Sequence, residues 1–253
     1  MIEATAVYVL WLREMKRYFR AKSRILGSLA IPFIFLAFLG LGFNRMAVPG
    51  AAGVGYIRFL VPGIVGMSLL FQSIFAGLSV LWDREFGFLK EIMVAPVSRV
   101  SIVLGRIAGG VTTALVQGLL VLAVSTLVGF RARGAADILV ALVFMVLIST
   151  TFIGLGLVFA SKIKDMQGYS IIMNFVVFPL FFLSGALYPL GNLPAWLRVL
   201  SYLDPLTYGV DGLRGALIGV AARSIPADMA IMAAIALLMV GLGAWSFERT
   251  ENT

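Results

Sequence analysis

Long apolar runs separated by short polar segments set the pattern of this chain. The six runs cover residues 25–43, 60–81, 107–130, 138–160, 170–190 and 229–247. A membrane-spanning helix needs roughly 20 mainly apolar residues, and a spanning segment must be a helix or part of a closed barrel. The runs are continuous and do not alternate as barrel strands do. The pattern predicts an all-α membrane protein with six transmembrane helices, kinked at Pro32, Pro62 and Pro179.

Composition agrees with a chain that lies in lipid. The 253 residues are 61% hydrophobic and 13% charged, whereas soluble domains are about 45–50% apolar and about 25% charged. Cysteine and histidine are absent from the sequence, which excludes disulfides, thiol nucleophiles and imidazole bases. The net charge of +8 comes from basic residues beside the apolar runs, so we expect no nucleic-acid partner.

The distribution of Lys and Arg predicts the orientation. With the N-terminus inside, the cytoplasmic segments hold thirteen basic residues and the outer segments seven, which favours both termini in the cytoplasm. We therefore expect a multi-pass protein of the cell membrane. Six basic residues among the first 24, followed by a long apolar run, fit a cleavable signal peptide poorly, so we expect the first helix to be retained.

Residues 1–24 form a predicted amphipathic helix that lies in the inner membrane interface. One face collects the basic residues Arg13, Lys16, Arg17, Arg20 and Arg24. The opposite face collects Val7, Trp11, Met15, Tyr18 and Phe19. Two roles stay open, a simple anchor on anionic lipid and a part of a docking platform for a cytoplasmic partner.

Sites for chemistry are scarce in this sequence. It has no phosphate-binding loop and no Gly-Lys pair, and so no ATPase site of this kind. No span has a carboxylate near its centre, which argues against an ion-coupled carrier. The mid-span polar residues are Gln72, Ser73, Gln117, Thr150, Thr151, Asn174 and Ser184. They either bond helices together, or Gln72, Gln117 and Asn174 line a translocation path.

The loop after the second run, residues 84–95, has an amphipathic pattern. Phe86, Leu89 and Ile92 repeat at helical spacing beside Lys90 and Glu91. We predict a short cytoplasmic helix that ends near Pro96.

The segment D-R-E-F-G-F-L-K-E-I-M-V-A-P-V-S-R, followed by I-V-L-G-R, closely resembles the signature of ABC transporter type-2 permeases. Residues 193–217, L-P-A-W-L-R-V-L-S-Y-L-D-P-L-T-Y-G-V-D-G-L-R-G-A-L, resemble the segment before the last span of the same family. That resemblance implies two short re-entrant helices in the outer leaflet. An ordinary outer loop with the aromatic anchors Trp196, Tyr202 and Tyr208 is the alternative.

The resemblance also implies a half-transporter, in which two permease copies pair as a homodimer and each docks a separate ATP-binding subunit. The implied coupling residues are Arg84, Glu85, Phe86, Leu89, Lys90, Glu91 and Ile92. ATP and Mg²⁺ would belong to the partner, and this chain would hold no cofactor or metal and be no enzyme itself. Phe88, Lys90 and Ala95 depart from the family pattern, which leaves the details of the partner open.

We therefore expect the membrane subunit of an ATP-driven exporter for a hydrophobic or amphipathic substrate, such as a drug, a lipid or a lipid-linked saccharide. An ATP-independent carrier or channel is the alternative. A membrane scaffold or sensor component is a third hypothesis.

Overall fold

The computed structural model describes residues 3–43, 54–85, 98–163 and 165–250, and this part of the chain is helical almost throughout. The helices are α1 (Ala4–Arg20), α2 (Lys22–Phe35), α3 (Tyr56–Glu85), α5 (Arg99–Leu127), α6 (Ala135–Lys162), α7 (Met166–Leu183), α8 (Ala195–Leu203), α9 (Pro205–Ile218) and α10 (Ile225–Thr250). A π-helical turn, Leu36–Gly40, extends α2, and a 3₁₀ turn, Leu190–Asn192, precedes α8.

The prediction of an all-helical chain with six candidate spans is confirmed. In the described residues, six helical segments are long and apolar enough to cross a membrane: Lys22–Gly40, Tyr56–Asp83, Val100–Leu127, Ala135–Lys162, Met166–Leu183 and Ile225–Ser246. Their bounds differ from those of the apolar runs by a few residues, and most at the start of the third span and the end of the fifth. Helix α5 begins at Arg99, because the Ser98 side chain caps it by accepting from the Ser101 amide. Helix α7 ends at Leu183, short of residue 190, because the chain turns at Gly185 with a φ of 73°.

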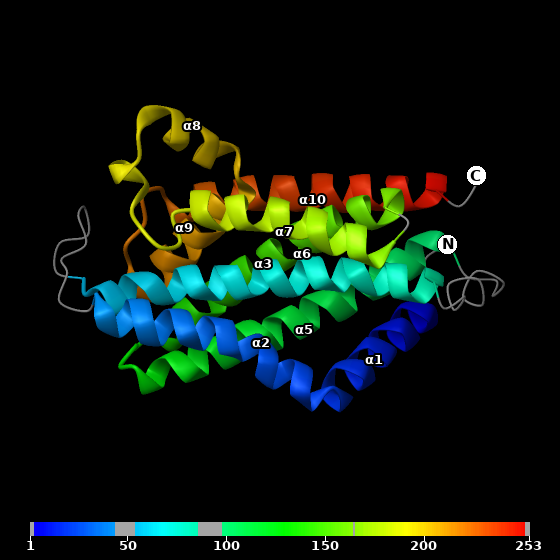
Figure 1. Cartoon of the computed structure of the whole chain (residues 1–253), viewed down its shortest axis with the longest axis horizontal. Helices are drawn as coiled ribbons and strands as arrows, with labels where there is room; N and C mark the ends of the chain where they lie inside the picture. The colour runs from blue at the N-terminus through cyan, green and yellow to red at the C-terminus, as the bar shows by residue number, and fades with distance from the viewer. Residues whose placement is uncertain (1–2, 44–53, 86–97, 164, 251–253) are drawn as a thin grey trace.

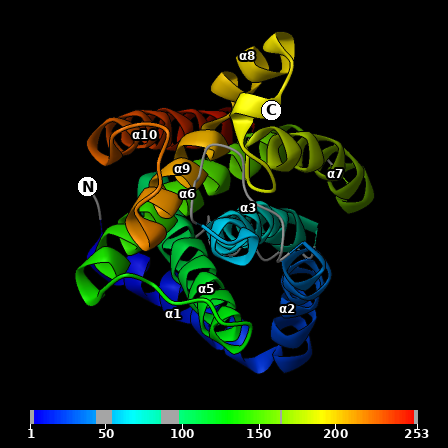
Figure 2. The same ribbon diagram turned by 90° about the vertical axis from the view of Figure 1, so that its left-hand side faces the viewer.

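The spans form one bundle with α3 near its centre (Figures 1 and 2). In the apolar window of α3, 82% of the residues are buried, against 17% in α2, 22% in α7 and 17% in α10. The described ends of the chain lie together at one end of the bundle, which we call the proximal end. Helices α8 and α9 lie at the opposite end, the distal end (Figure 1).

Glycines allow the helices to approach closely. A Cβ atom at Gly63 would lie 2.2 Å from the Ala186 carbonyl oxygen, and one at Gly154 would lie 2.7 Å from the Met239 backbone. Neither space would admit a side chain without a backbone shift. At these two positions glycine lets neighbouring backbone segments approach closely.

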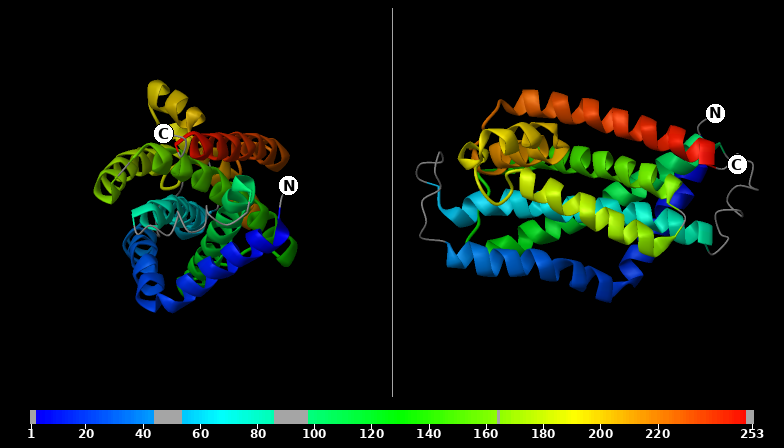
Figure 3. Two further views of the ribbon diagram at one scale, coloured as in Figure 1. Left: turned by 90° about the vertical axis from the view of Figure 1, so that its right-hand side faces the viewer. Right: turned by 45° about the horizontal axis from the view of Figure 1, so that its top comes forward.

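The N-terminal helix is shorter than the predicted 1–24. Helix α1 ends at Arg20, and the chain bends at Ala21 into α2, so Lys22 and Arg24 belong to the first span. Helix α1 runs obliquely to the spans (Figure 3). At 17 residues it is too short for a straight crossing.

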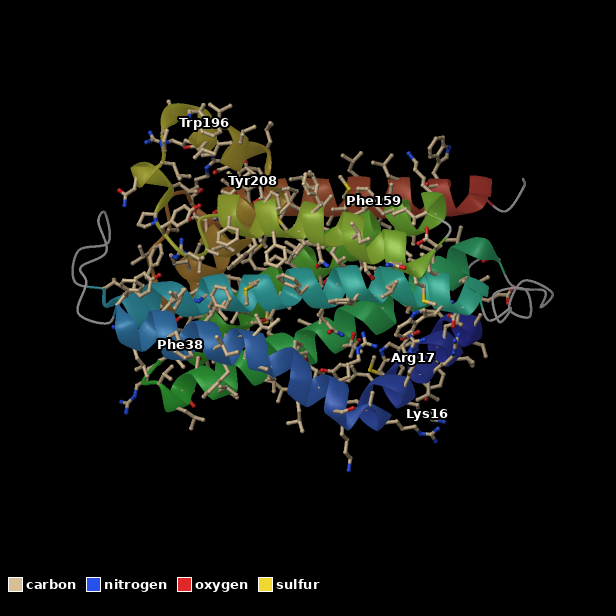
Figure 4. All side chains as sticks on the ribbon, in the orientation of Figure 1. Lys16, Arg17, Phe38, Phe159, Trp196 and Tyr208 are labelled. Carbon is tan, nitrogen blue, oxygen red and sulfur yellow. The ribbon has the colours of Figure 1, made fainter. Side chains whose placement is uncertain are left out.

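Residues 193–217 form the two short helices α8 and α9, not an irregular loop. The Asp204 carboxylate caps α9 by accepting from the Leu206 amide at 2.9 Å. Helix α9 is buried along most of its length against α6, α3 and α10. Helix α8 stands away from the bundle, with Trp196 65% exposed (Figure 4).

Candidate functional site

An ion-pair cluster at the proximal end joins α1, α3 and α5. Its carboxylate is Asp83, which is 5% exposed and lies two residues before the end of α3, beyond the predicted span of residues 60–81. Arg13 of α1 donates to Asp83 Oδ1 at 2.6 Å, and Arg106 of α5 donates to Oδ2. Arg17 Nη1 lies 4.0 Å from the same carboxylate, and its guanidinium lies 5.9 Å from the Trp82 ring centroid. One carboxylate thus holds cations from two other helices.

Helix α1 lies on α5 through polar and close-packed contacts around this cluster. Trp11 donates its indole N–H to Thr112 Oγ1 at 3.0 Å. A Cβ atom at Gly105 would lie 2.8 Å from Leu10, and one at Gly109 would lie 2.8 Å from Glu14. The predicted basic face is therefore divided, with Lys16 exposed and Arg17 turned toward the bundle (Figure 4).

The predicted coupling residues are only partly within the described residues. Arg84 and Glu85 are the last two residues of α3. Phe86, Leu89, Lys90, Glu91 and Ile92 lie outside the described residues, so their predicted helix stays a prediction. Asp83, the carboxylate of the ion-pair cluster, directly precedes the predicted coupling segment in the chain.

Two of the three predicted path residues lie close to Tyr18 of α1. Gln117 Oε1 accepts from Ser28 Oγ at 2.9 Å and from Tyr18 Oη at 3.4 Å. Gln72 lines a cavity of about 20 Å³ that Tyr18 and Thr113 also line. Burial raises the pKa of Tyr18, with Arg24 opposing the rise, so the hydroxyl stays a donor. The cavity holds about one water, too little for a substrate in this conformation.

Asn174, the third predicted path residue, lies apart from the other two. It is exposed on α7. Its neighbours on that face, Ile171 and Phe175, are 62% and 82% exposed. The structure therefore does not bring Asn174 together with Gln72 and Gln117.

A larger cavity, of about 530 Å³, lies at the distal end. It is bounded by one face of α9, by Tyr202 of α8, by residues 220–223 and by Asp228 of α10. Arg214, buried in its wall, donates to the carbonyls of Gly185 at 3.0 Å and Phe59 at 3.4 Å. Burial lowers the pKa of Arg214 to about 10, so it remains a cation at neutral pH.

The sequence reasoning missed the residues that form the ion-pair cluster. It placed Asp83 at the end of a span, and it assigned the basic face of residues 1–24 to a lipid anchor or a docking platform. Asp83 lies 70 positions from Arg13 and 23 from Arg106, so no local pattern links them. The usable signal was a carboxylate that directly follows an apolar run, because an ionised group at the edge of a span needs a nearby cation.

Residues 5–218 match the family model described as ABC-2 type transporter. The chain belongs to the ABC-2 type transporter family. The membership predicted from residues 83–106 and 193–217 is therefore confirmed, and the permease is a multi-pass membrane protein.

Several curated permeases are similar to this ABC-2 permease. The putative transport permease ycf38 of Pyropia yezoensis is 30% identical over 145 residues, 55% of this chain and 48% of that protein. The inner membrane transport permease YadH of Escherichia coli K12 is 33% identical over 133 residues, 52% of this chain and 51% of its own. The probable doxorubicin resistance permease DrrC of Mycobacterium tuberculosis is 24% identical over 216 residues, which are 82% of this chain and 75% of that protein. The aligned part of this permease spans about half the length of the first two relatives.

Proposed function

We propose that this permease is the membrane subunit of an ATP-driven exporter that moves a hydrophobic or amphipathic substrate out of the cell. A separate ATP-binding subunit, holding ATP and Mg²⁺, supplies the work. Residues 84–95 dock in that subunit as a coupling helix, with the termini in the cytoplasm. Family membership supports a transport subunit, and the Asp83 cluster supports the mechanical link.

The Asp83 cluster carries the proposal because of its place in the chain. It ties the end of α3, immediately before residues 86–97, to α1 and α5. A push on the coupling segment therefore reaches α3 directly, α5 through the buried Asp83–Arg106 pair, and α1 through the half-buried pair of Asp83 with Arg13. Such pairs are strongly directional when desolvated, so the three helices move as one unit between two states.

A second permease copy packs against α7 in this proposal. Asn174 lies on an exposed face of α7 between Ile171 and Phe175, with Phe178 one turn further on. An amide that faces hydrocarbon without a partner is costly. Side-chain amides also hold helices together in lipid. A homodimer that buries Asn174 satisfies this group, and the substrate path then opens between the two protomers.

Assembly and ATP-dependent transport test the proposal together. The permease is purified with its ATP-binding subunit and reconstituted in vesicles. Phe86→Asp with Leu89→Asp should abolish co-purification and ATP-dependent transport, since two charges would enter an apolar docking surface. Trp196→Asp, on the exposed α8 at the other end of the bundle, is the matched control and should leave co-purification intact.

Two results would contradict the proposal. Normal assembly and transport by the Phe86→Asp, Leu89→Asp variant would remove the coupling role. Transport that persists without an ATP-binding subunit, driven by an ion gradient, would favour the carrier or channel. Disulfide cross-linking of Asn174→Cys, in a chain with no native cysteine, tests the dimer separately, and an uncrosslinked monomer would contradict the α7 contact.

A further inference from the structure

The distal cavity contains an acidic group that no described residue neutralises by direct bonding. Asp228, in the first turn of α10, is 0% exposed and lines the cavity. Neither of its carboxylate oxygens accepts a hydrogen bond from a described residue. A buried carboxylate whose side-chain neighbour is a second carboxyl group costs several kcal/mol when it is ionised. Such a group in a cavity wall is suited to a ligand that brings a positive charge.

Asp211 of α9 lies beside Asp228 and interacts with it through their side chains. Its own oxygens accept from the backbone amides of Ala222 at 2.9 Å and of Arg223 at 3.0 Å. Asp211 therefore fixes the 220–223 loop against α9. It adds negative charge beside Asp228 and supplies no donor that would satisfy an ionised Asp228.

Arg223 occupies the cavity mouth as an organic cation would. Its guanidinium carbon lies 5.0 Å from the Tyr202 ring centroid and 4.8 Å from the Tyr208 ring centroid. Arg223 and Tyr202 are exposed. A cation held by two aromatic faces near a carboxylate pair is the arrangement by which proteins bind amines and guanidines. In this permease the side chain of Arg223 lies where a bound organic cation would lie.

The other two arginines of the cavity are bound elsewhere. Arg198 donates to the carbonyls of Gly191 and Leu193. Arg214 donates to the carbonyls of Gly185 and Phe59 and lies 3.7 Å from the Phe59 ring centroid. Both guanidinium groups donate to backbone carbonyls of the cavity wall, and Arg214 also attracts Asp211 electrostatically, so Asp228 is the acidic group left without a bonded cation. The volume of about 530 Å³ is that of a small-molecule site.

We propose that the distal cavity is a binding site for a lipophilic organic cation, with Asp228 as the charge-recognising residue and Arg223 as a resident competitor. The aromatic rings of Tyr202 and Tyr208 hold the ligand after Arg223 swings outward into solvent. This inference rests on the proposed export function and narrows its substrate class to amphipathic cations at the distal end.

Binding of tetraphenylphosphonium to the full-length permease in phosphatidylcholine nanodiscs tests the site, with empty nanodiscs subtracted. Tetraphenylborate, of the same shape and opposite charge, is the probe control. Asp228→Asn should weaken tetraphenylphosphonium binding at least about tenfold, since one ionic contact of ordinary strength is worth that factor. Arg223→Gln should tighten it about threefold by removing the competitor. Asp137→Asn, at the first turn of α6 and outside the cavity lining, should leave it unchanged.

Four results would overturn the inference, and the first three concern tetraphenylphosphonium binding. They are equal binding by the wild type and Asp228→Asn, equal weakening by Asp228→Asn and Arg223→Gln, and no binding to either the wild type or Arg223→Gln. A preference for tetraphenylborate would instead make this an anion site. Elution volume and thermal midpoint of each variant show that it is folded. Co-purification with the ATP-binding subunit and ATP-dependent transport judge the export function separately, so that function can stand when the cation site fails.

Discussion

Replacing Asp83 by asparagine removes the carboxylate that Arg13, Arg17 and Arg106 share. Asp83 and Arg106 are 5% and 6% exposed, so the loss leaves a buried guanidinium without its counter-charge. Breaking a buried ion pair in this way costs roughly 3–5 kcal/mol. At roughly 3 °C per kcal/mol for a chain of this size, the thermal midpoint should fall by about 10 °C. The three cations then also repel one another.

Several arginines share one carboxylate in the cluster, so loss of Asp83 should reduce stability more than loss of one arginine. Arg106→Gln leaves Asp83 with Arg13 at 2.6 Å, so it should cost less than Asp83→Asn, roughly 1–2 kcal/mol. Glu3→Gln changes an exposed carboxylate of the same region and should stay within about 0.5 kcal/mol. Thermal unfolding in detergent, followed by monomer recovery on size exclusion, measures all three.

Equal losses for Asp83→Asn and Arg106→Gln would refute the reasoning, because they would show that the two charges act only as a pair. A midpoint for Asp83→Asn within 2 °C of the wild type would refute the burial of the cluster itself, given the penalty of about 3 kcal/mol that burial implies.

The remaining predictions concern packing, pH and topology. Tyr169 donates its hydroxyl to a backbone carbonyl of α3 at 2.9 Å, so Tyr169→Phe should destabilise by about 1 kcal/mol, and no loss in thermal unfolding would contradict this bond. Gly77→Ala places a Cβ atom 2.5 Å from that hydroxyl; it should cost more, roughly 1–3 kcal/mol, and less when combined with Tyr169→Phe. Burial raises the pKa of Asp204 to about 8; the folded state therefore holds this proton more tightly than the unfolded chain, and stability should fall as pH rises toward 8. Asp204→Asn, which keeps the helix cap, should remove that slope in midpoint-versus-pH curves, and an unchanged slope would assign it to another group. With the termini inside, Ala222→Cys should react with an impermeant maleimide added to whole cells and Glu3→Cys should not; the reverse labelling would invert the topology.

The spans were predictable because lipid imposes one rule on every residue of a crossing helix. Length and apolar character sufficed for all six candidates. The ends were less predictable, because they depend on single caps. Ser98 extends α5 toward the N-terminus and Gly185 ends α7 early, and a hydropathy pattern does not weigh either residue.

The candidate sites were less predictable, because each depends on which faces of distant helices meet. Gln117 and Asn174 are both mid-span amides in the sequence. Packing places Gln117 at 1% exposure against Tyr18 and Ser28, and Asn174 on an open face. Asp228 likewise reads as an ordinary first-turn carboxylate until α9 and the 220–223 loop enclose it.

Site-specific photocross-linking in the reconstituted complex tests the central claim most directly. A photoreactive amino acid at Leu89, in the predicted coupling segment, should cross-link to the ATP-binding subunit, and its yield should change when ATP is added. The same group at Asn192, at the distal end of the bundle, should give no such product. Cross-linking from Asn192 and not from Leu89 would contradict the account.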